Sequence, residues 1–165
     1  MAKVVLKLGD DISTDIIYPG RYMATVLPAE TPQYAFADIP EFNTPLRKGE
    51  IPAGSVIVAG KNFGCGSSRE QAASCLKGPD LVIVARHFAR IFLQNSINLG
   101  LRTVICPEIE AALSDEIEVT DDKVINRTSG KSFDIVPLPR ARQAIIDAGG
   151  LIAYTRQLLL QRAQK

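Results

Sequence analysis

The chain of 165 residues is 46% hydrophobic and 22% charged, and its 19 basic and 18 acidic residues leave a formal net charge of +1. This length predicts one domain over residues 1–165 and excludes a large multidomain enzyme. The near-neutral charge argues against nucleic acid and against an anionic membrane surface as partners. Neither a membrane-spanning run of ~18–20 apolar residues nor a signal peptide is recognisable, so we expect a soluble, cytoplasmic protein.

The cysteines give no sign of a disulfide framework or of a metal site. Cys65, Cys75 and Cys106 are odd in number and lack CxxC spacing. This pattern favours reduced thiols over disulfides or zinc ligation. We therefore expect no metal to be bound by this chain.

The first third of the chain is irregular after an initial strand. Residues 3–8 are rich in β-branched residues and end at Gly9, which predicts a strand followed by a polar loop. Proline and glycine then recur too often for a long helix or a central strand. They are Pro19, Gly20, Pro28, Pro32, Pro40, Pro45, Gly49 and Pro52. Such a weakly periodic segment is usually functional or mobile.

The middle of the chain alternates strands and helices. Apolar runs of strand length at 55–59, 81–85 and 103–106 predict three strands. Helical patterns over 69–76 and 88–99 separate them, and the second ends at a glycine. This β-α-β-α-β order predicts parallel strands joined by right-handed crossovers.

The last third predicts a β-meander followed by two helices. Short strand patterns at 116–120, 123–128 and 131–136 are separated by turn residues. Residues 140–148 and 151–162 then predict two helices, divided by two glycines. The fold class is therefore α/β, a mixed sheet with a parallel core and helices on its outside.

The segment most suggestive of chemistry is GKNFGCGSSREQ, residues 60–71, which joins a buried strand to a helix. Glycines let the backbone approach a ligand, and the first N–H groups of a helix attract anions. Ser68 and Gln71 have the spacing of a capping box, which makes Ser68 the expected N-cap and leaves the hydroxyl of Ser67 free. Neither a GxxxxGK[ST] phosphate loop nor a complete dinucleotide fingerprint is present.

Arg69 is expected in the first turn of this helix, where the helix dipole disfavours a cation by ~0.3–1 kcal/mol unless an anion is near. An arginine beside a helix N-terminus suits a carboxylic acid, because a guanidinium grips a carboxylate with two hydrogen bonds. The alternative is that the loop only shapes a connection between strand and helix. From the residues alone, both interpretations stand.

Other candidates have commoner structural explanations. His87 is the only histidine, at a strand-to-helix boundary, and no GxSxG elbow accompanies it. Cys65 more often fills space in such a loop than acts as a nucleophile, and Cys75 belongs on an apolar helix face. The carboxylates of Asp10, Asp11 and Asp15 could act in acid–base work, but ending a strand and forming turns is the commoner use of such residues.

The motifs together resemble a known family. Four segments carry the resemblance, in chain order GDDISTDIIYPGRYM, GKNFGCGSSREQAA, ARHFARIFLQNSINLGL and GGLIAYTR. Together they are similar to the small subunits of the aconitase superfamily, especially of 3-isopropylmalate dehydratases. The resemblance implies a swivelling β/β/α domain that works in a heteromer with a large subunit. In this family the large subunit carries a [4Fe-4S] cluster on three cysteines, and the substrate is a small dicarboxylate.

The resemblance also implies roles for individual residues. Ser67 matches the base that removes a proton next to a carboxylate, and loop N–H groups and a nearby arginine would stabilise its alkoxide. Arg69 matches the arginine that binds the substrate carboxylate, and Ser68 the neighbouring active-site serine. Asp15, in the Ser13-Thr14-Asp15 stretch, matches an acid near the substrate-binding site, and we expect it to have a structural, supporting role there. Gln71 departs from the family, where many members have histidine.

A loop of residues 22–25 matches the segment that senses the variable group of the substrate. It contains Tyr22, Met23, Ala24 and Thr25. Several relatives place arginine where Ala24 stands, and without that charge an apolar substituent is easier to accept than another carboxylate. Arg21 is close enough in sequence to compensate, so it is a further candidate for substrate binding.

The leading hypothesis is the small subunit of a hydro-lyase, most simply an isopropylmalate isomerase of leucine biosynthesis. Sister enzymes acting on dimethylmalate, citraconate or maleate, or homoaconitate share the same chemistry. A non-enzymatic alternative is a regulatory module that binds carboxylates without a catalytic partner.

Overall fold

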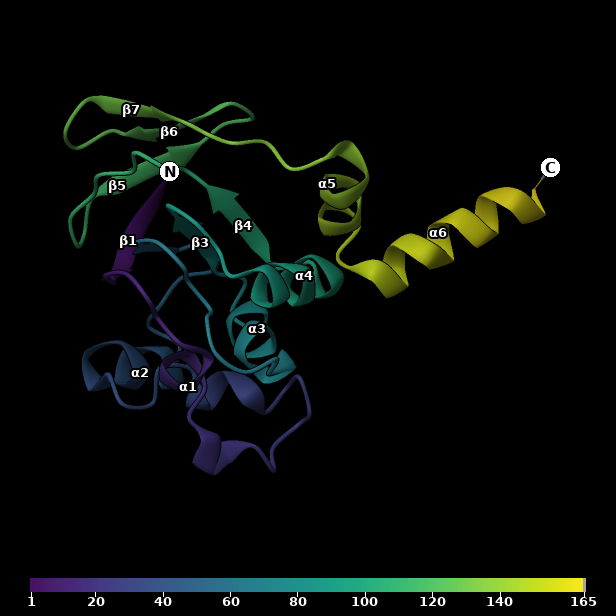
Figure 1. The fold of residues 1–165 in the computed structure, drawn as a ribbon, viewed down its shortest axis with the longest axis horizontal. Coiled ribbons are helices and arrows are strands. Elements are labelled where there is room, and N and C mark those ends of the chain that lie inside the picture. The colour runs from purple at the N-terminus through teal and green to yellow at the C-terminus, as the bar shows by residue number, and fades with distance from the viewer. Residues whose placement is uncertain (165) are drawn as a thin grey trace.

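The computed structural model describes residues 1–164 and contains one seven-stranded mixed sheet (Figure 1). The strands are β1 (Ala2–Lys7), β2 (Val56–Ala59), β3 (Val82–Ala85), β4 (Arg102–Ile105), β5 (Glu116–Val119), β6 (Lys123–Asn126) and β7 (Lys131–Asp134). Their spatial order is β4-β3-β2-β1-β5-β6-β7. β1 pairs in parallel with β2 and antiparallel with β5, so the parallel and the antiparallel parts meet at this strand.

The predicted alternation of strands and helices is confirmed. β2, β3 and β4 pair in parallel, and the apolar runs VIVA of β2 and β3 are buried at all four positions. Burial on both faces explains why these strands are continuously apolar rather than alternating. β5, β6 and β7 form the predicted antiparallel meander.

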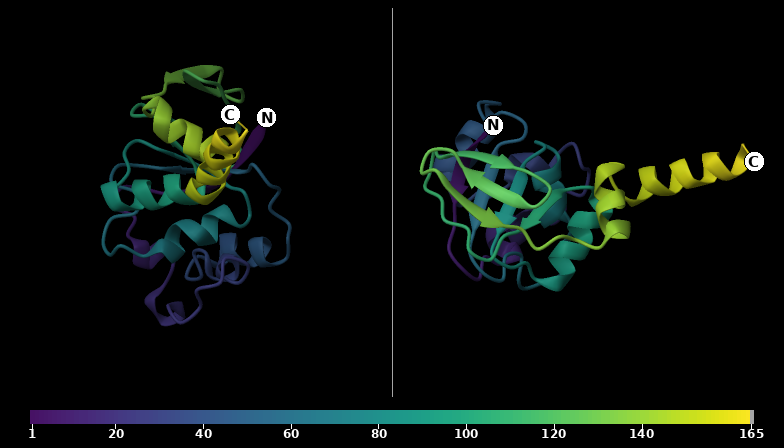
Figure 2. Two further views of the ribbon diagram at one scale, coloured as in Figure 1. Left: turned by 90° about the vertical axis from the view of Figure 1, so that its right-hand side faces the viewer. Right: turned by 90° about the horizontal axis from the view of Figure 1, so that it is seen from above.

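Most of the helices lie on one side of the sheet, and the last one projects from the molecule. They are α1 (Thr14–Ile17), α2 (Pro40–Arg47), α3 (Glu70–Lys77), α4 (Arg90–Leu99), α5 (Arg140–Asp147) and α6 (Leu151–Ala163), with 3₁₀ turns at Gly20–Tyr22 and Thr31–Tyr34. Two apolar cores result. The larger includes Leu6, Ile57, Ile83 and Leu76 on the helical side. The smaller includes Val4, Val58, Val84, Ile117 and Val124, between the parallel strands and the meander. These layers are the expected β/β/α arrangement, with the meander standing above the parallel strands in Figure 2.

The irregular segment after β1 is more structured than its prolines suggest. α2 forms because Pro40 occupies the first turn, where no N–H needs an intrahelical acceptor. Pro45 lies inside the same helix, which is only eight residues long. The side-chain amide of Asn43 donates to the carbonyls of Gln33 and Ala35 at 2.9 and 2.8 Å and so ties α2 to the preceding turn.

The C-terminal helix α6 projects from the rest of the molecule (Figures 1 and 2). It begins after Gly150, whose φ is +122°, and no residue of α6 is buried. Within residues 1–164, no helix is both long enough and apolar enough to span a membrane.

Candidate active site at the carboxyl ends of the strands

The candidate site is built from loops that continue the parallel strands beyond their carboxyl ends. The loop after β1 and the loop after β2 run side by side, joined by backbone hydrogen bonds. Gly60 donates to Gly9 at 3.0 Å, Gly64 to Ile12 at 2.7 Å, and Thr14 to the carbonyl of Cys65 at 2.7 Å. In open α/β sheets this edge is where ligands bind, especially where the strand order changes direction.

The loop after β3 is joined to the same assembly. Phe63 donates its N–H to the carbonyl of His87 at 3.0 Å, and Ala89 donates to the carbonyl of Phe63 at 2.9 Å. The exposed His87 thus contributes its backbone to the junction, consistent with the structural interpretation of this residue. Below the junction, the Phe63 and Phe92 rings meet edge to face with their centroids 5.2 Å apart.

Gly64 allows the loop to lie directly on α4. A Cβ at this position would fall 2.2 Å from Cγ of Phe92, and φ is +82°. Both the space and the backbone conformation therefore require glycine. This close contact fixes the distance between α4 and the loop that carries Ser67.

Ser67 is brought beside Thr14. Thr14 Oγ1 and Ser67 Oγ are 3.3 Å apart, close enough for a hydrogen bond, and either hydroxyl can donate. Thr14 is buried, whereas Ser67 is exposed. Gly66 precedes the serine with φ +98°, and a Cβ there would lie 3.4 Å from the Thr14 hydroxyl. Ser67 thus contacts the buried Thr14 on one side and solvent on the other.

Arg69 lies across the same two loops. Its Nη1 forms an ion pair with the Asp15 carboxylate and donates to the Tyr18 carbonyl at 3.3 Å. The Arg69 side chain is 19% exposed and that of Asp15 62%. A Cβ at Gly20 would lie 3.4 Å from Arg69 Nη2, so the chain passes closely over the guanidinium. Within residues 1–164 the other guanidinium nitrogens have no hydrogen-bond acceptor, which leaves donors for a ligand.

The predicted capping arrangement was wrong. α3 begins at Glu70, its N-cap is Arg69, and no side chain caps it. Ser68 lies one residue too early to cap the helix, and Gln71 lies in the wrong position to complete a capping box. The cause is tertiary: Arg69 has extended backbone angles (φ −68°, ψ 112°) while its side chain is bound to Asp15. The anionic partner expected for Arg69 is, in this chain, Asp15 itself.

Arg21 does not join this cluster. Its Nη1 and Nη2 donate to the two carboxylate oxygens of Asp38 at 3.1 and 2.5 Å, and its guanidinium lies 4.6 Å from the centre of the Tyr22 ring. The hydrogen bond to Asp38 raises the pKa of Arg21, and Arg21 lowers the pKa of Asp38. The charge that could have compensated for Ala24 is therefore already paired.

The loop of residues 22–25 is held from below by Tyr18. The Tyr18 hydroxyl donates to the carbonyls of Tyr22 and Thr25 at 3.1 and 3.2 Å, and its burial raises the pKa of this phenol. The Tyr22 ring stacks on Tyr34 with centroids 4.1 Å apart. Met23 is half-buried and Ala24 exposed, so the loop presents an uncharged surface after the paired Arg21.

Three residues at the site carry roles that sequence reasoning missed. Thr14 supports Ser67, Gly20 leaves room for Arg69, and Tyr18 fixes the neighbouring loop. The sequence held one weak signal for Thr14, its place between Ser13 and Asp15 in a polar stretch. The contacts of Tyr18 and Gly20 depend on the folded chain alone.

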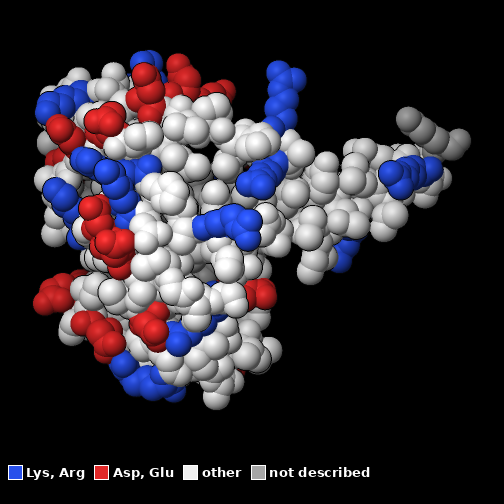
Figure 3. All heavy atoms as spheres, viewed as in Figure 1, with Lys and Arg blue, Asp and Glu red and all other residues white. Residues whose placement is uncertain are grey.

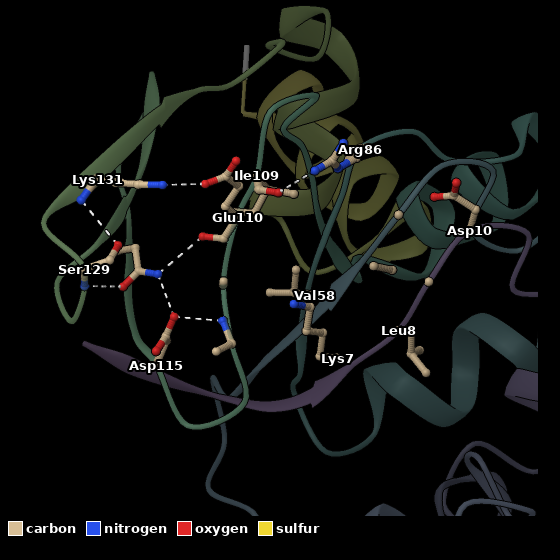
Figure 4. A pocket seen from close by; sticks show the side chains of 16 residues that line it. Lys7, Leu8, Asp10, Val58, Arg86, Ile109, Glu110, Asp115, Ser129 and Lys131 are labelled. Atoms are coloured by element: carbon tan, nitrogen blue, oxygen red, sulfur yellow. Dashed lines mark hydrogen bonds and ion pairs between the residues drawn. The ribbon is translucent and has the colours of Figure 1, made fainter.

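A hollow of about 550 Å³ lies on the other face of the sheet, beneath the meander (Figure 4). Its charged side chains are largely engaged in structural contacts. Lys131 pairs with Glu110 at 2.7 Å, Arg86 donates to the Ile109 carbonyl at 3.2 Å, and Asp115 accepts from Asn126 at 2.7 Å. The hollow reaches the same two loops, because Gly9, Asp10 and Gly60 line it, whereas Ser67 and Arg69 do not.

All three cysteines are free thiols. Cys75 and Cys106 are buried, and burial raises their thiol pKa values, that of Cys106 to about 11. Cys75 packs in the core, as predicted. Among residues 1–164, no three His, Cys, Asp or Glu side chains are grouped to hold a metal ion.

Comparison with known proteins places this architecture in a family. Residues 15–108 match the model of the aconitase C-terminal domain. The chain is 40% identical over 161 residues to a protein of Methanosarcina mazei and 46% identical over 156 residues to one of Methanopyrus kandleri. These alignments cover 94% and 90% of this chain and 96% and 88% of the relatives. The relatives are named 3-isopropylmalate dehydratase small subunit and small subunit 1, respectively.

A solved structure agrees over almost the whole molecule. The crystal structure of a 3-isopropylmalate dehydratase from Methanocaldococcus jannaschii superposes with a TM-score of 0.88 at 36% sequence identity. The match covers 98% of this chain and 96% of that chain. This chain is therefore a member of the aconitase C-terminal domain family, within the group of 3-isopropylmalate dehydratase small subunits.

Proposed function

We propose that this chain is the small subunit of a 3-isopropylmalate dehydratase, which interconverts 3-isopropylmalate and 2-isopropylmalate in leucine biosynthesis. The observation that carries the proposal is that one loop carries both an exposed Ser67 hydroxyl, supported by Thr14, and an Arg69 guanidinium whose Nη2 and Nε have no acceptor within residues 1–164. Together they offer a base and a carboxylate anchor two residues apart in the sequence. The names of the relatives supply the substrate.

In the proposed reaction, Ser67 Oγ takes the proton from the substrate carbon next to a carboxylate. The electrons of that C–H bond form a carbon–carbon double bond as the hydroxyl leaves the adjacent carbon. Re-addition of water with the opposite placement completes the isomerisation. Arg69 holds the carboxylate, and its charge favours the alkoxide form of the serine. When bound in the large subunit, an iron–sulfur cluster supplies a Lewis acid for the departing hydroxyl.

A second subunit is needed for this chemistry. Ser67 is exposed, and an alkoxide base is far more effective where water is excluded. The cluster ligands also require another chain, because residues 1–164 group no such side chains. We therefore propose a heteromer in which the large subunit closes over Ser67.

The neighbouring loop supports an alkyl-substituted malate as substrate. Its side chains at Tyr22, Met23 and Ala24 carry no charge, and the Arg21 guanidinium is already bound to Asp38. Placing a further carboxylate here would cost its desolvation without a free cation. An isopropyl group involves no such cost, which favours isopropylmalate over homoaconitate.

The test is Ser67→Ala in the complex reconstituted with its large subunit under anaerobic conditions. Loss of the base lowers kcat by about 10²–10⁴-fold. The free energy of unfolding of the isolated chain falls by no more than about 1 kcal/mol, because the Ser67 side chain is exposed and loses one hydrogen bond, to Thr14. Wild-type turnover with citraconate or dimethylmalate exceeding that with isopropylmalate would reassign the substrate, and full activity of the variant would remove Ser67 from the mechanism.

A further inference from the structure

Arg21 lies beside the guanidinium that is proposed to bind the substrate carboxylate. A Cβ on Gly20 would fall 3.4 Å from Nη2 of Arg69, so the chain runs directly over this group. Arg21 is the next residue, and its Cα therefore lies only about 3.8 Å further along the chain. A long arginine side chain at this place is within reach of a ligand that Arg69 holds.

Asp38 binds the Arg21 guanidinium through both of its terminal nitrogens. Nη1 and Nη2 donate to the two carboxylate oxygens at 3.1 and 2.5 Å. Such a two-point contact fixes the plane of the guanidinium as well as its position. The group also lies 4.6 Å from the centre of the Tyr22 ring, which is itself stacked on Tyr34. Arg21 is thereby kept in one orientation, on a carboxylate supplied by the turn before α2.

The two ion pairs at the site differ in what they leave for a ligand. Asp15 pairs with only one terminal nitrogen of Arg69, and within residues 1–164 the Nη2 and Nε groups of Arg69 have no acceptor. Asp38, in contrast, occupies both terminal nitrogens of Arg21. Arg69 is therefore open to a carboxylate, and Arg21 is closed to one.

The pair between Arg21 and Asp38 adds little to the stability of the fold. The two side chains are 52% and 61% exposed, and exposed ion pairs contribute little to the free energy of unfolding. On the face shown in Figure 3, basic and acidic side chains are intermixed over the body of the molecule. Individual pairs, rather than one broad patch, therefore set the local charge on this face. Removal of Asp38 would free a cation next to Arg69 at small cost to the fold.

We propose that Asp38 is a positioning residue that sets substrate specificity, because by binding Arg21 it denies the variable group of the substrate a second guanidinium. The inference rests on the proposed function and deepens it. A carboxylate in the variable group would lose its water without meeting a free cation, whereas an alkyl group has no such cost. Asp38 thus discriminates against the wrong substrate by withholding a contact from it.

The experiment measures the binding of two unreactive analogues to the complex with the large subunit, by calorimetry under anaerobic conditions. Isopropylsuccinate and tricarballylate share a succinate core and differ in carrying an isopropyl or a carboxymethyl group. We expect the wild-type complex to prefer isopropylsuccinate. Asp38→Ala should lower the Kd of tricarballylate relative to that of isopropylsuccinate about tenfold or more, because the freed Arg21 gains a carboxylate partner. Adding Arg21→Gln to this variant should return the ratio of the two Kd values to that of wild type.

Two further variants serve as controls. Asp134→Ala changes the net charge equally and breaks the ion pair with Lys123 in the meander, so the ratio should stay as in wild type. Asp38→Asn keeps the shape of the side chain without its charge and should shift the ratio in the same direction by a smaller factor. An unchanged ratio in both Asp38 variants overturns the role of Asp38, and so does a gain that persists without Arg21.

Isopropylmalate turnover by the same complexes judges the proposed function separately. A wild-type complex that prefers isopropylsuccinate but turns over no isopropylmalate refutes the proposed reaction, and the ratio of Kd values still decides the role of Asp38. A wild-type complex that prefers tricarballylate refutes both the alkyl-substituted substrate and the role of Asp38. Binding of neither analogue to the wild-type complex also refutes both.

Discussion

Gly64 illustrates at the scale of one residue how the site is held in place. Gly64→Ala would press a methyl group into the Phe92 ring and force an L-residue to keep φ +82°. We expect a loss of about 2–4 kcal/mol in the free energy of unfolding, measured with urea.

Gly130→Ala provides the matched control for this substitution. Gly130 has a similar φ of +75° but open space around its Cα. It should therefore lose only about 1 kcal/mol, the cost of the backbone conformation alone. Equal losses for the two variants would show that contact with Phe92 contributes nothing.

Thr14 gives a prediction about the base. Thr14→Val keeps the shape of a buried residue but removes the hydroxyl 3.3 Å from Ser67 Oγ. We expect kcat of the reconstituted enzyme to fall about tenfold, with KM little changed and the pH–rate profile displaced. Thr14→Ser, which restores a hydroxyl, should recover most of the rate. A valine variant with wild-type kcat and pH profile would assign Thr14 to packing alone.

How well single residues could be predicted depends on how local their contacts are. The loop of Ser67, Ser68 and Arg69 was recognisable because glycines, serines and an arginine follow one another in a short segment. The partner of each side chain was not recognisable, because Thr14 and Asp15 belong to another loop. The same contacts moved the start of α3 past the expected serine cap.

At the scale of elements, Asp115 joins the meander to the segment before it. Its carboxylate accepts from Ala112 N–H at 2.8 Å and Asn126 Nδ2 at 2.7 Å, and these bonds lower its pKa. A depressed folded-state pKa stabilises the fold above the unfolded value of about 3.9, and this contribution is lost as the pH falls.

Asp115→Asn should therefore lower the urea midpoint near neutral pH, where the wild-type carboxylate is charged. The difference from wild type should narrow as the pH falls below about 4 and the wild-type carboxylate becomes protonated. Glu108→Gln, at an exposed acid nearby, serves as control. If the difference in urea midpoint stayed constant across this pH range, the effect would come from the changed shape of the side chain and not from its charge.

The elements themselves followed from periodicity, and their boundaries did not. Continuous apolar runs at β2 and β3 are a strong signal because both faces are buried. α4 begins at Arg90 rather than near Phe88, because Phe88 forms a bridge with Phe63 and Ala89 donates to the Phe63 carbonyl. The segment with many prolines concealed α2, whose first proline starts the helix rather than preventing it.

At the scale of the whole molecule, the layers were expected from the family resemblance. The place of β1 in the sheet and the exposure of α6 were not expected. The alternating elements indicate a parallel core, but no local pattern says that β1 lies between β2 and β5. Nor does a local pattern say that α6 leaves the body unpacked, because its leucines suit a buried helix equally well. Both features depend on where distant segments come to rest.

The central place of β1 also bears on how the chain is made. β1 is synthesised before the two strands that pair with it, β2 from Val56 and β5 through Ile117. While the ribosome is still adding the residues before β2, β1 has both edges unpaired, and its antiparallel edge stays open until β5 emerges. Such long-range pairing is slow and leaves nascent chains prone to aggregate. Among the paired edges of this sheet, the edge of β1 that faces β5 is therefore the one that waits longest for its partner during synthesis.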